Sequence, residues 1–203
     1  MKEINSEKRM NLWNETKSIP VSRSMVWEAY KLVRANKGSS GLDGVSMEAF
    51  DAHRRQHLYK LWNRMASGSY FPPPVKEVEI PKKNGKVRKL GIPTIGDRVG
   101  QMVVKQFLET RLEKIFSPNS YGYRPNKNAH QALESVRQNC RKTDWVIDLD
   151  IKGFFDNIDH GKLMLAVEKH VPENWVRLYI KRWLLMPVQT KEGKLVEKQG
   201  KGT

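Results

Sequence analysis

Asp148 and Asp150 stand out as candidate catalytic side chains, because they interrupt an otherwise apolar run at residues 145–151. Such a run predicts a strand, along which side chains alternate between two faces. The two carboxylates would then share one face, and the aliphatic residues between them would point into the core. A buried carboxylate is costly without a partner, and Mg²⁺ is one partner. An aspartate that caps the next turn or pairs with a lysine is the alternative.

The residues that follow Asp150 could bind a phosphorylated ligand. Gly153 would let a triphosphate approach backbone N–H groups in the turn, because glycine has no side chain in the way. Phe154 and Phe155 come next. Packing in the core is the ordinary role of such rings, and we expect it of one of the two.

A hairpin at residues 75–92 offers cations for the same chemistry. Apolar and charged residues alternate along it, and Asn84-Gly85 is a strong signal for a two-residue turn. Basic residues gather at and beside its tip: Lys82, Lys83, Lys86, Arg88 and Lys89. A guanidinium can bind a phosphate through two hydrogen bonds. A basic hairpin that is only solvated is the alternative.

The composition points to a polyanionic partner. The chain has 203 residues and a formal net charge of +15, which favours nucleic acid, although charge can also serve solubility alone. Its one cysteine, Cys140, excludes an internal disulfide and fits a reducing, cytoplasmic setting. The polar start shows no signal peptide, and no apolar run is long enough to span a bilayer, so we expect no membrane partner.

Helical spacing and hairpin signals predict an α+β fold. We expect helices that begin near Ser24, Ser46 and Asp97, helices at residues 129–140, 162–170 and 175–185, a strand at residues 145–151, and hairpins at residues 75–92 and 188–198.

Residues 145–160 (WVIDLDIKGFFDNIDH) resemble the first catalytic block of reverse transcriptases. The resemblance implies that Asp150 is the catalytic, metal-binding carboxylate, that the Ile151 carbonyl is a second Mg²⁺ ligand, and that Asp148 has a supporting role. It also assigns Gly153, Phe154 and Phe155 to dNTP binding. Phe155 falls where the family has the aromatic residue that excludes a ribose 2′-hydroxyl.

Further blocks resemble the group II intron branch of that family. Residues 76–101 are similar to its fingers hairpin, which implies that Arg88 and Lys82 bind the triphosphate, with Lys83 and Lys86 as competitors for the lysine role. Residues 119–125 with 130–132 and the loop at 37–44 are similar to two other blocks of this branch. RNA contacts are expected at Lys37, Lys83, Lys86, Arg98 and Arg124, although Arg124 could instead hold the fingers in place.

The resemblance implies reverse-transcriptase fingers with an N-terminal helical extension at residues 1–74, fingers at 75–140 and a partial palm at 141–203. The expected function is that of a group II intron reverse transcriptase and maturase that aids splicing and intron mobility. Its partners would be intron and template RNA, a DNA primer and dNTPs; whether it forms a homodimer stays open.

Family enzymes also need an Asp-Asp turn, and this sequence contains no Asp-Asp pair. We therefore expect the chain alone, as a fragment, not to polymerise, since two-metal phosphoryl transfer needs carboxylates from both blocks. A non-catalytic scaffold for structured RNA is the alternative. Reverse transcriptases of defence or diversity systems, which share the palm blocks, are another.

Overall fold

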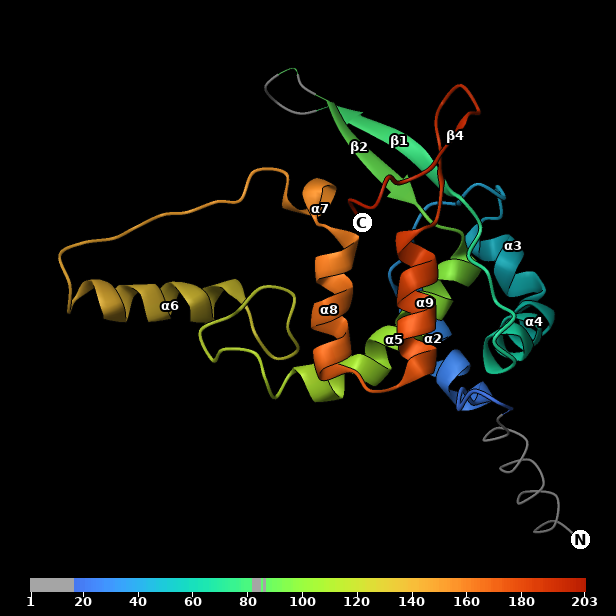
Figure 1. The fold of residues 1–203 in the computed structure, drawn as a ribbon, viewed down its shortest axis with the longest axis horizontal. Coiled ribbons are helices and arrows are strands. Elements are labelled where there is room, and N and C mark those ends of the chain that lie inside the picture. The colour runs from blue at the N-terminus through green and yellow to red at the C-terminus, as the bar shows by residue number, and fades with distance from the viewer. Residues whose placement is uncertain (1–16, 82–84, 86) are drawn as a thin grey trace, which may run out of the picture.

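The computed structural model describes residues 17–81, 85 and 87–203, and it begins with helices (Figure 1). Helix α2 (Arg23–Ala35) starts where the Ser22 hydroxyl accepts a hydrogen bond from the Met25 N–H at 3.2 Å. Ser46 caps α3 (Met47–Ala52) in the same way, as predicted. The single helix expected beyond Ser46 is divided, because His53 leaves helical geometry before α4 (Arg54–Ala66) begins.

A small sheet follows, with strand order β2-β1-β3-β4 within the described residues. Strands β1 (Val75–Pro81) and β2 (Val87–Ile92) form the predicted antiparallel hairpin. The second predicted hairpin pairs β3 (Val188–Gln189) with β4 (Leu195–Val196), and β3 runs parallel to β1. Lys82, Lys83 and Lys86, at the tip of the first hairpin, lie outside the described residues.

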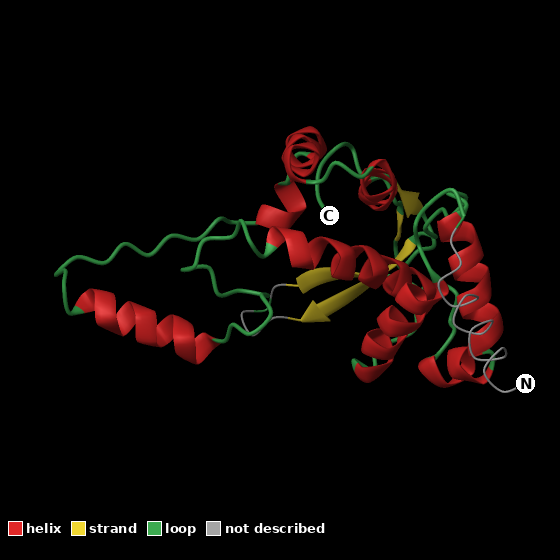
Figure 2. Cartoon of the chain, turned by 90° about the horizontal axis from the view of Figure 1, so that it is seen from below, coloured by secondary structure: helices red, strands yellow, loops and turns green. Residues whose placement is uncertain are grey.

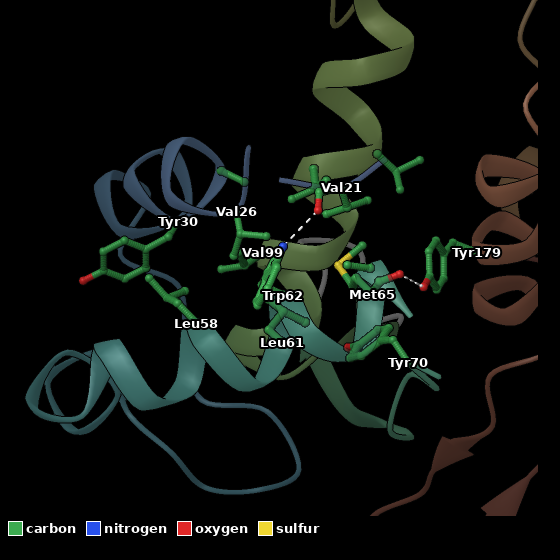
Figure 3. Packing of buried hydrophobic residues seen from close by; sticks show 14 of the residues in the cluster. Val21, Val26, Tyr30, Leu58, Leu61, Trp62, Met65, Tyr70, Val99 and Tyr179 are labelled. Carbon is green, nitrogen blue, oxygen red and sulfur yellow. Dashed lines mark hydrogen bonds between the residues drawn. The ribbon is translucent and has the colours of Figure 1, made fainter. Parts of the chain in front are cut away.

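The core lies between helices that are distant in sequence. Helix α5 (Ile95–Leu112) packs on α2 and α4, and α9 (Asn174–Leu184) closes the far side. Figure 3 shows two hydrogen bonds that join these layers: the Trp62 indole N–H donates to the Val21 carbonyl at 2.9 Å, and the Tyr179 hydroxyl donates to the Met65 carbonyl at 2.6 Å. The aromatic residues of this core therefore also satisfy backbone groups that the fold buries.

Helix α6 (Ala129–Cys140) lies away from this core. It has no buried residue, and long connections join it to α5 and to the short helix α7 (Phe154–Asn157) (Figures 1 and 2). Its boundaries match the prediction because they are set locally: Asn128 and Gln131 exchange side-chain-to-backbone hydrogen bonds at its start.

The prediction of a strand at residues 145–151 is wrong. The segment is extended but belongs to no strand, and Ile147 and Leu149, expected in the core, are 82% and 87% exposed. A strand needs a neighbouring backbone to accept and donate its hydrogen bonds, and none of the described strands lies beside it. The apolar pattern indicates extended chain, but it cannot supply the partner.

The chain returns to the body through α8 (His160–His170), which Asp159 caps. The last residues pack beside α7 and α8: the Thr203 N–H donates to the Phe155 carbonyl at 2.9 Å, and the His160 ring bonds the Gly202 carbonyl at 2.7 Å. These contacts hold the turn after Asp150 close to the sheet. No helix in the described part of the chain has the length and apolar character to cross a membrane.

Candidate active site

A cleft of about 1780 Å³ lies between the β1–β2 hairpin, α5, α9 and the turn after Asp150. It brings together predicted residues that are distant in sequence: Arg88 from β2, Asp150, Ile151, Gly153, Phe154 and Phe155 from the turn, and Arg98 and Arg124 from α5 and the loop beyond it. Lys37 is exposed on its own loop and is not part of this lining, whereas its neighbour Asn36 is.

The carboxylates of this cleft come from Asp150 and Asp156 on the turn and from glutamates on β1 and α5. Asp150 is exposed, so water or a ligand can reach its carboxylate. In the described part of the chain no group of at least three His, Cys, Asp or Glu side chains gathers around one point. The Asp150 and Asp156 carboxylates are oxygen donors, and Mg²⁺ takes one or two such carboxylates together with water and phosphate oxygens.

Gly153 has a conformational role in the turn. Its φ is +61°, in the left-handed region, and a Cβ there would lie 2.9 Å from the Asn157 amide nitrogen. Asn157 donates to the Gly153 carbonyl at 2.8 Å, which closes the turn. Glycine is thus required by the backbone, in addition to the close approach of a ligand that the sequence suggests.

The Phe154 and Phe155 rings both face out of the turn. They meet edge to face, with centroids 5.5 Å apart, and are 47% and 63% exposed. The alternative that one of them packs in the core is therefore wrong in this structure. Both rings remain available to a ligand in the cleft.

Arg124 binds within its own loop. Its side chain is 9% exposed, forms an ion pair with Glu113 at 2.6 Å, and donates to the carbonyls of Ser117 and Ser120 at 2.6 and 2.8 Å. It also lies over the Phe116 ring. Of the two roles expected for Arg124, these contacts support the one that holds the loop in place.

Arg98 likewise contacts protein. It donates to the Ser39 carbonyl at 2.6 Å and so holds the loop at residues 37–44 against the start of α5. Gly38 makes room for it, because a Cβ there would lie 1.8 Å from an Arg98 Nη. Gly41 packs on the backbone of Thr94, which would lie 2.6 Å from a Cβ at that position. Burial lowers the pKa of the Arg98 guanidinium.

Asp97 is a buried residue to which the sequence alone assigns no functional role. It is fully buried and accepts hydrogen bonds from the Tyr70 hydroxyl at 2.7 Å, the Trp183 indole at 2.8 Å and the Gln101 amide at 2.8 Å. Burial raises the pKa of its carboxyl group, and these donors oppose the rise. Asp97 thereby joins α5 to α9 and to the segment before β1, behind the cleft. From the sequence alone, the position of Asp97 in the first turn of a predicted helix suggests only that it caps the start of that helix.

Comparisons with known proteins show the family to which this chain is similar. The family "Reverse transcriptase (RNA-dependent DNA polymerase)" matches residues 80–201, more than half of the chain. The group II intron-encoded protein LtrA of Lactococcus lactis subsp. cremoris is 37% identical over 137 residues, 67% of this chain and 23% of LtrA. Protein YkfC of Escherichia coli is 36% identical over 153 residues, 72% of this chain and 40% of YkfC. The chain thus spans less than half the length of these relatives.

A solved partial Cas6-RT-Cas1–Cas2 complex contains a chain with the same fold. The TM-score is 0.57 at 19% identity, and the match covers 90% of this chain and 30% of the other. At that identity the likeness shows the fold alone, and it confirms the fingers-and-palm fold class that the motifs predict. Because the family match covers more than half of the chain, the chain belongs to the reverse transcriptase family, and the relatives it resembles include group II intron-encoded proteins.

Proposed function

We propose that this chain supplies the fingers and part of the palm of an RNA-directed DNA polymerase of the group II intron type. The observation that carries the proposal is the cleft, whose lining includes Arg88 of β2 together with Asp150 and Phe155 of the turn. An exposed carboxylate, a guanidinium and an aromatic ring are the groups that a metal-bound nucleoside triphosphate needs. The family match over residues 80–201 supports the same activity.

Each group has a distinct task in this proposal. The Asp150 carboxylate and the Ile151 carbonyl would hold Mg²⁺, which supplies Lewis-acid stabilisation of the attacking and leaving oxygens. Arg88, with Lys82 from the hairpin tip, binds the triphosphate and neutralises its charge. Gly153 keeps the turn close to the phosphates, and Phe155 excludes a 2′-hydroxyl and so selects deoxynucleotides, with Phe154 packed at its edge.

The proposal includes the organisation and partners of the whole protein. Residues 1–74 form the helical extension, 75–140 the fingers and 141–203 part of the palm. Template RNA and intron RNA are the nucleic-acid partners, a DNA primer supplies the 3′-hydroxyl, and maturase activity on the intron accompanies synthesis. The likeness to LtrA, a group II intron-encoded protein, and the basic charge of this chain support RNA as a partner. The single cysteine, Cys140, is free, and this supports a location of the protein in the reducing cytoplasm.

RNA-templated DNA synthesis is the test. The protein encoded by the complete reading frame is expected to extend a DNA primer on an RNA template with dNTPs and Mg²⁺, and to lose this activity when Mg²⁺ is chelated. The 203 residues alone are expected not to do so, because they contain no Asp-Asp turn. If the complete protein binds structured RNA but makes no DNA, the scaffold alternative replaces the polymerase.

A further inference from the structure

Tyr123 has a backbone and a side chain that packing within the chain does not explain. Its φ is +55°, in the left-handed region that residues other than glycine rarely adopt. Its side chain is fully exposed, at 103% of the reference area. A large aromatic ring held outward on a strained backbone is a feature that folding alone does not favour, and such strain is concentrated at functional sites.

The loop around Tyr123 is held by its other side chains. Arg124 bonds Glu113 and the carbonyls of Ser117 and Ser120, as described above. On the other side Lys127 donates to the Pro118 carbonyl at 3.2 Å and lies 4.9 Å from the centre of the Tyr121 ring. The neighbouring aromatic residue, Tyr121, is thus half-buried, whereas Tyr123 is fully exposed. These contacts hold the loop on both sides of Tyr123.

Tyr123 also belongs to the wall of the cleft that contains Asp150 and Phe155. The same cleft is lined by cationic side chains, of which Lys89, Lys105 and Arg124 form ion pairs with glutamates of the lining: Arg88, Lys89, Arg98, Lys105, Arg124, Lys198 and Lys201. Aromatic rings beside a basic groove are the combination by which proteins bind single-stranded nucleic acid, since every base offers a face for stacking and every nucleotide a phosphate.

We propose that Tyr123 stacks on an unpaired base of single-stranded RNA at the edge of this cleft. The inference rests on the proposed function, because it assumes that RNA enters the cleft. Tyr123 would add a base-binding position to the residues proposed to bind dNTP and metal. Tyr123, rather than Arg124, would be the residue of this loop that contacts RNA. The ring, and not the hydroxyl, carries the contact.

The experiment measures binding of a single-stranded oligouridylate to the chain and maps photocrosslinks from 5-iodouridine in the same RNA, since this base crosslinks to aromatic rings stacked on it. Tyr123→Phe is expected to bind like the wild type. Tyr123→Ala and Tyr123→Gly are expected to bind roughly tenfold more weakly and to lose the crosslink to this loop. Trp145→Ala is the matched control, because Trp145 is 88% exposed and does not line the cleft.

Tyr123→Gly separates a binding role from a structural one. Glycine adopts a positive φ readily, so this variant is expected to melt no lower than the wild type while binding RNA more weakly. A parallel loss of melting temperature and binding would overturn the inference. Equal binding by all Tyr123 variants, or an equal loss in Trp145→Ala or Tyr123→Phe, would also overturn it. Failure of the wild-type chain to bind any RNA would instead remove the proposed function, and the stacking role with it.

Discussion

Asp97 accepts three side-chain hydrogen bonds behind the cleft. Its carboxylate is the shared acceptor for Tyr70, Trp183 and Gln101, which come from different parts of the chain. Asp97→Ala would leave the buried Tyr70 hydroxyl and the half-buried Trp183 and Gln101 donors without this acceptor. We expect it to destabilise the fold by about 3 kcal/mol or more, since each buried unsatisfied donor costs roughly 1–3 kcal/mol, measured by urea denaturation.

Asp97→Asn tests the ionisation of the same residue. Burial raises the pKa of Asp97 in the folded chain above that in the unfolded chain, so the folded state holds the proton more tightly. The stability linked to that proton is complete below about pH 4 and is lost as the pH rises through the folded pKa. The melting temperature of Asp97→Asn is therefore expected to gain on that of the wild type as the pH rises above about 4, the pKa of an unfolded aspartate.

The exposed Asp144→Asn variant provides the control for that series. Its melting temperature should follow the wild type across the pH range. A constant difference between Asp97→Asn and the wild type, or one that shrinks as the pH rises, would contradict a raised pKa at Asp97.

Arg98 is expected to control the loop at residues 37–44. Arg98→Ala removes the hydrogen bond to the Ser39 carbonyl and should free the loop. Trypsin is then expected to cleave after Lys37 about tenfold faster, which is the effect that loss of a hydrogen bond from a charged donor implies. Gly38→Ala should have the same effect, because its Cβ would displace the guanidinium.

Gly96→Ala is the matched control, since nothing lies within 4 Å of a Cβ at that position. Arg98→Lys should restore part of the protection, because an ammonium can still donate to the carbonyl. Cleavage at the wild-type rate in both Arg98→Ala and Gly38→Ala would show that other contacts hold the loop.

At the scale of elements, the segment at residues 145–151 behaves differently from the helices around it. It is extended, exposed and apolar, and such a segment offers unpaired N–H and C=O groups to another strand. In the chain of 203 residues we expect its amides to exchange with solvent deuterium within seconds, whereas the amides of α5 exchange slowly. Slow exchange at residues 146–151 would mean that the segment is paired, in this chain or with a second copy.

Some elements depend on nearby residues and others on distant ones, and this difference determines which elements the sequence could predict. Helices α2 and α6 and the hairpin of β1 and β2 depend on caps, spacing and turns within a few residues, so local patterns suffice. The split between α3 and α4 at His53 and the unpaired segment after Trp145 depend on tertiary surroundings. A strand in particular requires a distant partner, which no local pattern reveals.

Within the candidate site, too, some features could be predicted from the sequence and others could not. The motif around Asp150 and the hairpin carrying Arg88 are recognisable because their residue types match a known chemistry. The hydrogen bonds of Arg98 and Arg124 are not, since a basic residue looks the same in sequence whether it faces solvent or binds a carbonyl. The network around Asp97 joins residues as far apart as Tyr70 and Trp183, so no spacing could indicate it.

At the scale of the whole molecule, we expect the net charge of +15 to govern the proposed association with RNA. Binding of single-stranded RNA is expected to weaken at least tenfold between about 50 and 200 mM salt, which corresponds to roughly three phosphates neutralised. Fluorescence anisotropy at a series of salt concentrations measures this slope. A flat salt dependence would contradict electrostatic binding and would leave the charge to serve solubility.

Single-nucleotide incorporation tests whether the cleft around Asp150 is a nucleotide-polymerising site. The protein encoded by the complete reading frame is mixed with an RNA template, a DNA primer, one dNTP and Mg²⁺. Asp150→Asn is expected to slow incorporation by at least about a hundredfold, while Asp144→Asn, also exposed but outside the cleft, leaves it unchanged. Incorporation by Asp150→Asn at the wild-type rate would contradict a catalytic role for Asp150 and thus a polymerising site in this cleft.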